Sequence, residues 1–162
     1  MSRLEREEVE RLYRTHAKVL VVFASSVVGD RSKAQDVVQQ VFLKLIDRPI
    51  EHPENWAAYL YSAVRNTARN EVRSNQRLLE LDEAQPWFAV EHATADFLSE
   101  RRLRRALWAL PEEQREVAVM HIWGELTFAT IARVLGINEN TAASRYRYAL
   151  AQLREAMQAK KV

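Results

Sequence analysis

The stretch that most restricts the fold is residues 127–153, TFATIARVLGINENTAASRYRYALAQL, which predicts two helices joined by a tight turn. Ile131 and Leu135 follow the helical period, and Gly136 can adopt the left-handed backbone conformation in which such a helix ends. Asn138 is then a favourable N-cap for a second helix. The pattern therefore predicts a helix-turn-helix motif near the carboxyl end of the chain.

The second helix of this motif is predicted to have one buried and one polar face. Apolar residues recur at intervals of three and four, and polar side chains occupy the other side of the first two turns. Side chains in that position can reach base edges and phosphates. An ordinary helical hairpin also carries Gly at a helix end and a polar outer face, so these features alone leave a purely structural role open. The predicted buried set is Ala142, Tyr146, Ala149 and Leu153, and the outward set is Glu139, Asn140, Thr141, Ser144, Arg145, Arg147 and Tyr148.

The composition favours an all-α protein, and 162 residues could form one ordinary domain or two small helical ones. Three Gly and four Pro among 162 residues leave little material for the turns of a many-stranded sheet, whereas 48% hydrophobic residues can build real cores. The absence of Cys excludes disulfides and thiolate metal sites and favours the cytoplasm. The charged start has no signal-peptide apolar segment, and no apolar run is long enough to span a membrane.

Charge divides the chain into three parts. Residues 1–77 and 101–162 have an excess of Lys and Arg, whereas residues 78–100 contain six acids and neither Lys nor Arg. Two basic blocks on either side of an acidic segment fit two domains that face nucleic acid, joined by a linker of opposite sign, although a merely solvated surface explains modest excesses as well. The length and charge of the linker raise the hypothesis that the free protein covers its DNA-binding surfaces by packing the two domains together.

The first domain is predicted to contain three helices, at about 4–28, 32–47 and 56–73. Ser32, with Gln35 three residues later, resembles a capping box for the second. The segment 47–55, DRPIEHPEN, holds two of the four Pro and must be a loop. Apolar residues are expected on the inner sides of these helices, including Tyr13 on the first, Ile46 on the second and Tyr59 on the third.

The third helix also has a predicted outer stripe of basic and amide side chains, with Tyr61 interleaved. Such a surface suits a nucleic-acid strand whose phosphates meet Arg and whose bases stack on aromatic rings. The stripe consists of Arg65, Asn66, Arg69, Asn70, Arg73 and Asn75.

At this point three blocks of the chain resemble the extracytoplasmic-function (ECF) sigma factors of bacterial RNA polymerase, in the order of that family. AQDVVQQVFLKL, 34–45, resembles the polymerase-binding helix, and WAAYLYSAVRNTARNEVRSNQR, 56–77, the helix that follows it. Residues 107–155, with their Leu-Pro-x-x-Gln-Arg-Glu start and Gly-Ile turn, resemble the promoter-binding domain. Two departures are Gln40, where the family usually has an acid, and Ala143, where it often has a basic side chain.

The resemblance implies a division of labour. Domain 1–77 would bind the polymerase clamp and melt and read the −10 element, linker 78–100 would thread through the polymerase, and domain 101–162 would bind the flap and read the −35 element. Many family members are held inactive by an anti-sigma protein, so such a partner is expected. The implied residues are Asp36, Gln39 and Gln40 for polymerase, Arg48, His52, Asn66, Arg69, Asn70 and Arg73 for the −10 element, and Asn140, Thr141, Ser144, Arg145 and Arg147 for the −35 element.

No nucleotide, metal or nucleophile pattern is present in the sequence, so we expect neither catalysis nor a cofactor. The four His are scattered without ligand spacing. Two alternatives remain at this stage. A helix-turn-helix repressor would bind duplex DNA tightly without polymerase, and a helical interaction protein or small enzyme would not depend on DNA at all.

Overall fold

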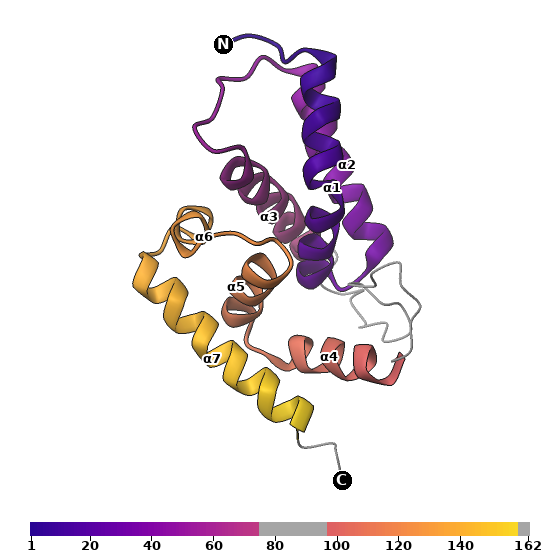
Figure 1. Ribbon diagram of the computed structural model, residues 1–162. Helices are drawn as coiled ribbons and strands as arrows, with labels where there is room; N and C mark the ends of the chain where they lie inside the picture. The colour runs from indigo at the N-terminus through magenta and orange to yellow at the C-terminus, as the bar shows by residue number, and fades with distance from the viewer. Residues whose placement is uncertain (75–96, 159–162) are drawn as a thin grey trace.

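The computed structural model describes residues 1–74 and 97–158, and within these ranges the chain is built from helices, which confirms the all-α prediction (Figure 1). One isolated bridge joins the amino terminus to the 47–55 loop, where Ser2 and Ile50 exchange backbone hydrogen bonds of 3.4 and 2.9 Å. Residues 78–96 of the predicted linker, and Asn75, lie outside the described ranges. The helices are α1 (Arg6–Val28), α2 (Arg31–Asp47), α3 (Trp56–Ser74), α4 (Phe97–Ala109), α5 (Glu112–Ile122), α6 (Phe128–Leu135) and α7 (Glu139–Gln158).

The turn between α1 and α2 corrects one prediction. Gly29 ends α1 in the left-handed conformation, with a φ of 78°. Asp30 follows in an extended conformation and accepts a hydrogen bond from the backbone N–H of Lys33 at 3.1 Å, so it is the N-cap of α2. The capping box predicted at Ser32 is therefore wrong, because Ser32 already lies within the first turn of the helix.

Asp30 and Ser32 give a matched pair of variants that tests this correction. We expect Asp30→Ala to lower the free energy of unfolding by about 1 kcal/mol, because the N–H of Lys33 loses its acceptor. Ser32→Ala should change it by only a few tenths of a kcal/mol, since Ser32 is an exposed first-turn residue. Urea denaturation followed by circular dichroism measures both, and an equal loss in the two variants would contradict the assignment.

Several aromatic and aliphatic residues of the first three helices differ in burial from the prediction. Tyr13 and Ile46 are 47% and 52% exposed, although both were expected in the core. Tyr59 is also partly exposed, whereas Tyr61 is only 2% exposed and packs its ring 5.2 Å from that of Phe23. Most positions follow the predicted helical period, but these residues border the buried stripe, and neighbouring helices decide their burial.

The guanidinium of Arg115 holds the turn from α4 to α5 in place. Pro111 precedes α5, and Arg115 on the first turns of α5 donates to the carbonyls that end α4. Its guanidinium also lies 4.2 Å from the centre of the Trp108 ring. Burial lowers the pKa of Arg115, and the nearby Glu112 and Glu116 oppose that shift. The accepting carbonyls are those of Leu107, Trp108 and Leu110, at 3.2, 3.3 and 3.1 Å.

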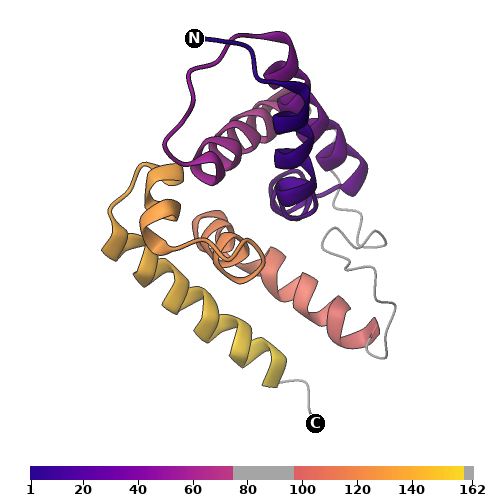
Figure 2. The ribbon, with the colours of Figure 1, turned by 45° about the horizontal axis from the view of Figure 1, so that its top comes forward.

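The two domains, α1–α3 and α4–α7, pack directly against each other. α5 lies against α1, and α6 lies against α3 (Figure 1). The turned view shows α4 and α7 running side by side on the far side of the second domain (Figure 2). One hydrophobic cluster runs through both domains, from Val9 and Phe23 in α1 to Leu107 and Leu153 in α4 and α7. The described residues therefore form one continuous core rather than two separate ones.

We expect His16 on α1 to make the folded protein less stable as the pH falls. Burial lowers its pKa from the usual 6.5, so the folded chain favours the neutral ring. Its contribution is fully present above pH 6.5 and is lost as the pH falls below that value, because the unfolded chain takes up the proton first. Thermal unfolding between about pH 7.5 and 5.5 should thus depend less on pH in His16→Gln than in the unmodified chain. Equal pH dependence in both proteins would rule out this role.

Candidate nucleic-acid interface

The predicted helix-turn-helix is formed by α6 and α7, and neighbouring residues cap both ends of α6 and the start of α7. Thr127 caps α6 by accepting from the N–H of Thr130 at 3.1 Å, and Gly136 ends α6 with a φ of 67°. The backbone N–H of Ile137 donates a hydrogen bond to the carbonyl oxygen of Ala132 at 3.1 Å. The side chain of Asn138 then accepts from the first turn of α7, at 2.8 Å from the N–H of Thr141. The turn is therefore built by local hydrogen bonds, as the sequence predicts.

An aromatic cluster beneath the motif sets the angle of α6 and α7 against α5. The ring of His121 on α5 stacks on Phe128 of α6 at 4.5 Å and meets Tyr146 of α7 edge-on at 4.4 Å. The Nδ1 atom of His121 lies 2.9 Å from the carbonyl oxygen of Leu126, which orients the ring. One side chain from each helix thus holds the motif, a role for His121 that its scattered position in the sequence does not reveal.

The five residues predicted to read duplex DNA all lie on α7, with graded exposure. Asn140 and Arg147 are exposed, and Arg147 donates to the hydroxyl of Ser144 at 3.0 Å. Arg145 is partly covered and lies 3.7 Å from a carboxylate oxygen of Glu113 on α5. Thr141 and Ser144 are half-buried. Asn140 and Arg147 are therefore exposed to solvent on the outer face of the helix, whereas Arg145 is paired with an acid of its own domain.

The residues predicted to grip an opened strand are only partly open to solvent. On α3, Asn66, Asn70 and Arg73 are exposed, whereas Arg69 is half-buried and lies 3.8 Å from Glu112 of α5. Arg65, which stands in the same stripe, forms an ion pair with the buried Glu116. The structure thus brings acids of the second domain onto the basic stripe of the first, and the sequence did not predict these particular pairs.

The 47–55 loop connects α2 to this stripe and carries the other two predicted residues, Arg48 and His52, both exposed. Nε2 of His52 lies 3.0 Å from a carboxylate oxygen of Glu8 on α1, and its ring is 5.9 Å from that of Trp56. Asn55 ends the loop and caps α3 by accepting from the N–H of Ala58 at 3.1 Å. Contacts at both ends and the bridge at Ile50 hold the loop in place.

A groove of about 670 Å³ runs between α1 and α2 on the first domain. Of the three residues predicted for polymerase, Gln39 lines the groove, whereas Asp36 and Gln40 are exposed on α2 outside it. Leu43 is 59% exposed and lies beside Ile46 in the wall. The groove is lined by Val9, Glu10, Tyr13, Arg14, Gln39, Phe42, Leu43 and Ile46. Sequence periodicity placed several of these apolar residues in the core and so did not reveal the groove.

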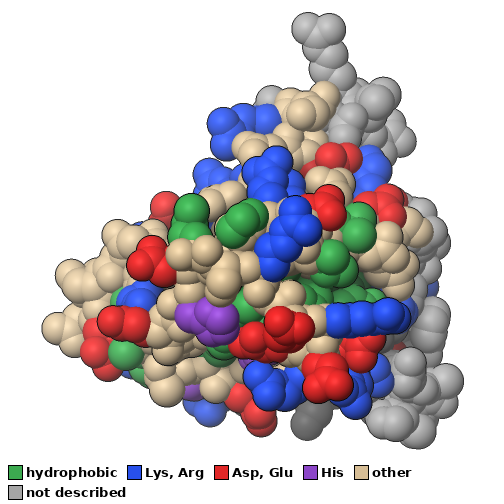
Figure 3. Space-filling view, turned by 90° about the horizontal axis from the view of Figure 1, so that it is seen from above, with side chains coloured by type: hydrophobic (Ala, Val, Ile, Leu, Met, Phe, Trp, Pro, Cys, Tyr) green, Lys and Arg blue, Asp and Glu red, His purple; other side chains and the backbone are tan. Residues whose placement is uncertain are grey.

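The surface carries no feature that points to another kind of site in the residues that the structure describes. Seen from above, hydrophobic, acidic and basic side chains are interspersed, so no single charge dominates that face (Figure 3). Among the residues that the structure describes, no group of His, Cys, Asp or Glu could hold a metal ion. In the part of the chain that the structure describes, every helix is too short or too polar to span a lipid bilayer.

Comparisons with known proteins bear on both domains. The family model for Sigma-70 region 2 matches residues 12–78, and that for Sigma-70, region 4 matches residues 100–153. The ECF RNA polymerase sigma factor SigL of Mycobacterium tuberculosis is 32% identical over 158 residues, covering 91% of this chain and 87% of that protein. The RNA polymerase sigma-E factor of Streptomyces coelicolor is 31% identical over 156 residues, with coverage of 94% and 88%.

A solved structure has a similar fold. The sigma factor RpoE in complex with the anti-sigma factor NepR, from Bartonella quintana, superimposes with a TM-score of 0.69 over 96% of this chain and 98% of that chain. The identity between the two sequences is 21%, so this likeness concerns the fold.

Proposed function

This chain belongs to the ECF sigma factors of the sigma-70 family, and from that premise we propose how its described surfaces divide the work of directing core RNA polymerase to promoters. The observation that carries the proposal is the helix-turn-helix of α6 and α7, whose second helix leaves Asn140 and Arg147 exposed. The sigma factor supplies promoter specificity, and catalysis belongs to the polymerase. Polymerase and promoter are found in the cytoplasm, where we place the protein.

We assign recognition of the −35 duplex to the amino-terminal half of α7. Arg147 is exposed and can make bidentate contacts with guanine or with phosphate, and Asn140 can pair with adenine. Arg145 would reach a phosphate after it leaves Glu113, since the two charged groups are 3.7 Å apart at the surface and such pairs are weak. Thr141 and Ser144 add short hydroxyl donors between them.

We assign capture of the opened −10 strand to α3 and the 47–55 loop. Asn66, Asn70 and Arg73 present amide and guanidinium groups along one exposed side of α3. His52 and the neighbouring Trp56 offer rings beside which an extruded base can stack, and Arg48 and Arg69 supply cations for its backbone. A DNA strand that crosses the loop would thus contact both aromatic rings for its bases and guanidinium groups for its phosphates.

We assign the groove between α1 and α2 to the polymerase clamp. Its wall combines Leu43 and Ile46 with Gln39, and Asp36 and Gln40 lie at its side on the same helix. An apolar strip edged by polar groups suits an amphipathic helix from the partner. An anti-sigma protein that occupied the same groove would prevent polymerase binding, and this is the surface where we expect one.

Run-off transcription tests the proposal. Purified core RNA polymerase is combined with a library of promoter fragments, with and without this protein. We expect transcripts that begin downstream of a shared pair of spaced elements only when the protein is present. Tight binding to duplex DNA without polymerase, together with no promoter-dependent transcript, would instead support a stand-alone repressor.

A further inference from the structure

The 47–55 loop is held in place by the amino-terminal segment of the chain. Ser2 and Ile50 exchange two backbone hydrogen bonds, and Leu4, two residues later, is buried in the core. Figures 1 and 2 both show this segment lying along the loop that joins α2 to α3. The middle of the loop is therefore fixed against residues that precede α1 and are distant from it in the sequence.

Glu8, in the first turn of α1, makes the next contact with the loop. One of its carboxylate oxygens lies 3.0 Å from Nε2 of His52, and the Glu8 side chain is 22% exposed. The backbone N–H of Glu8 donates to the carbonyl of Glu5 at 3.0 Å, which closes the first turn and fixes where the side chain begins. The helix dipole favours a negative charge at this position, so the carboxylate acts as a hydrogen-bond acceptor.

This contact determines which ring nitrogen of His52 carries a proton. An ionised carboxylate can only accept, so Nε2 is the donor whether the ring is neutral or protonated. In the neutral ring the other nitrogen, Nδ1, is then an acceptor. Within the described ranges Nδ1 makes no hydrogen bond, and the His52 side chain is 54% exposed. The neutral ring thus has an acceptor that a ligand on the loop can reach.

Trp56 restricts the same ring from a second direction. Its ring lies 5.9 Å from that of His52 at an interplanar angle of 75°, and Tyr59 meets Trp56 in a similar way at 5.6 Å. Edge-to-face contacts of this kind limit how far a ring can turn. One edge of the imidazole is held by Glu8 and its plane by Trp56. The direction of Nδ1 is therefore set by residues that lie outside the loop.

We propose that Glu8 is a positioning residue for promoter opening, which presents Nδ1 of His52 as an acceptor to the extruded base and so favours a base that carries an exocyclic amino group. The proposal rests on the assignment of the 47–55 loop to the opened −10 strand. Adenine, cytosine and guanine have such an amino group, and thymine has none. A thymine would place a carbonyl oxygen against Nδ1, and two acceptors leave each other unsatisfied.

The pair formed by Glu8 and His52 suits selection of a base better than it suits stabilisation of the fold. It lies at the surface, where ion pairs and hydrogen bonds between side chains contribute little to folding. A hydrogen-bonding group that is fixed in one protonation state, however, rejects a base that offers the wrong partner. The role of Glu8 should therefore be visible in base preference.

The first test identifies the tautomer and needs neither polymerase nor DNA. Nitrogen-15 NMR of the full chain labelled at histidine shows which ring nitrogen carries a proton, and His52→Gln identifies the signal of His52 among the four His. With the ring neutral, we expect the proton on Nε2 in the unmodified chain. Glu8→Gln should introduce a detectable population with the proton on Nδ1, because an amide can either accept from Nε2 or donate to it.

Glu7→Gln is the matched control, because it removes the same charge from the same turn of α1 at an exposed position. It should leave the proton on Nε2. A proton on Nδ1 in the unmodified chain, or no change of tautomer in Glu8→Gln, would overturn the proposal.

The second test measures base selection. Core polymerase carrying this chain is bound to fork-junction DNA from a promoter recovered by run-off transcription, with the non-template strand unpaired across the −10 element. An abasic site at each unpaired position in turn identifies the captured base as the one whose removal weakens binding most. We expect that base to carry an amino group, and its replacement by the analogue that lacks this group to weaken binding about tenfold. The analogues are purine for adenine, 2-pyrimidinone for cytosine and hypoxanthine for guanine.

Glu8→Gln should reduce this ratio to about twofold, whereas Glu7→Gln should preserve it. In a His52→Gln background, Glu8→Gln should have no further effect, because its influence passes through the ring. A captured thymine, or the same ratio in the unmodified chain and in Glu8→Gln, would overturn the positioning role. The proposed function would fail differently, since fork-junction DNA would then bind equally well to polymerase with and without this chain.

Discussion

Leu43→Glu is expected to abolish association with core RNA polymerase while leaving the helical fold intact. Leu43 is 59% exposed in the wall of the α1–α2 groove, so the protein's own core does not depend on it. Docking of the clamp would bury the leucine, which contributes roughly 1.5–3 kcal/mol. A carboxylate at that position would instead be buried without a partner, at a cost of several kcal/mol more. The sum corresponds to a loss of affinity of about a thousandfold or greater.

Co-sedimentation of labelled protein with core polymerase measures this effect, and circular dichroism checks the fold. Gln40→Glu is the matched variant, because it adds the same charge to the same helix outside the groove. It also supplies the acid that the family usually has there, so we expect binding at least as tight as that of the unmodified chain. Retained binding by Leu43→Glu would exclude the groove as the clamp site.

Arg147→Ala should lower transcription from the promoters recovered in the run-off experiment by about 10- to 100-fold, since one bidentate contact to a base is worth roughly 1–3 kcal/mol. The side chain is exposed, and within the protein its described hydrogen bond is to Ser144. Its removal should therefore act on DNA recognition and not on folding. Asn140→Ala should relax the preference at a single −35 base pair more than it lowers the overall rate.

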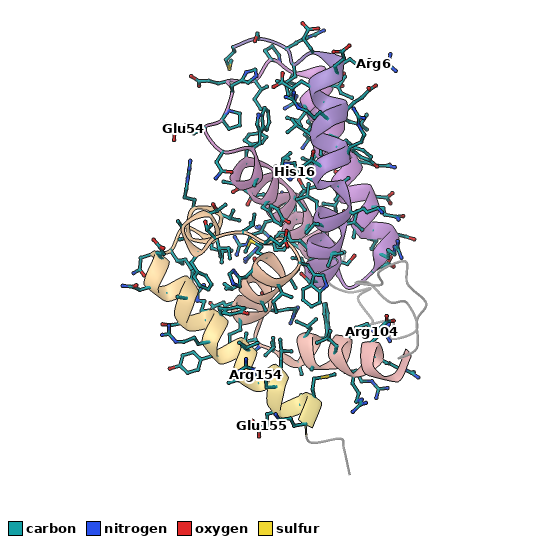
Figure 4. The ribbon with its side chains drawn as sticks, viewed as in Figure 1. Arg6, His16, Glu54, Arg104, Arg154 and Glu155 are labelled. Carbon is teal, nitrogen blue, oxygen red and sulfur yellow. The ribbon has the colours of Figure 1, made fainter. Side chains whose placement is uncertain are left out.

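Arg154→Ala is the control for this prediction, because Arg154 is an exposed Arg on the same helix, two turns beyond Arg147 (Figure 4). Transcription in the presence of saturating polymerase and graded salt compares the two variants. A loss that is equal for Arg147→Ala and Arg154→Ala would indicate that only the net charge of α7 matters. Base-specific recognition by Arg147 would then be excluded.

Predictions from the sequence succeeded where one short segment contains all the interacting groups. The turn of the helix-turn-helix is an example, because Gly136 and the cap at Asn138 satisfy backbone groups within the next few residues. The predicted cap of α2 was wrong by two residues. Asp30 and Ser32 are both good capping residues, and Asp30 is the cap because it directly follows the left-handed Gly29 that ends α1. The family resemblance supplied the order of the domains and their roles, which periodicity alone does not contain.

Burial at the edges of helices could not be predicted in the same way. Tyr13 and Ile46 follow the apolar period of α1 and α2, yet they line an open groove. Tyr61 was expected beside the basic stripe and is buried, because Phe23 of α1 and the turn after α5 cover it. In each case the residue lies at the border of a helical face, where a neighbouring helix distant in sequence decides whether water is excluded.

The sequence by itself determined the three helices of the first domain in outline, the helix-turn-helix, and the candidate residues on α2, α3 and α7. These features depend on the 3.6-residue period and on hydrogen bonds between near neighbours in the chain. Only the tertiary structure decided that Arg65 and Arg69 face Glu116 and Glu112. A pair of charges separated by about fifty residues leaves no periodic trace in the sequence, and its formation depends on how two helical domains pack.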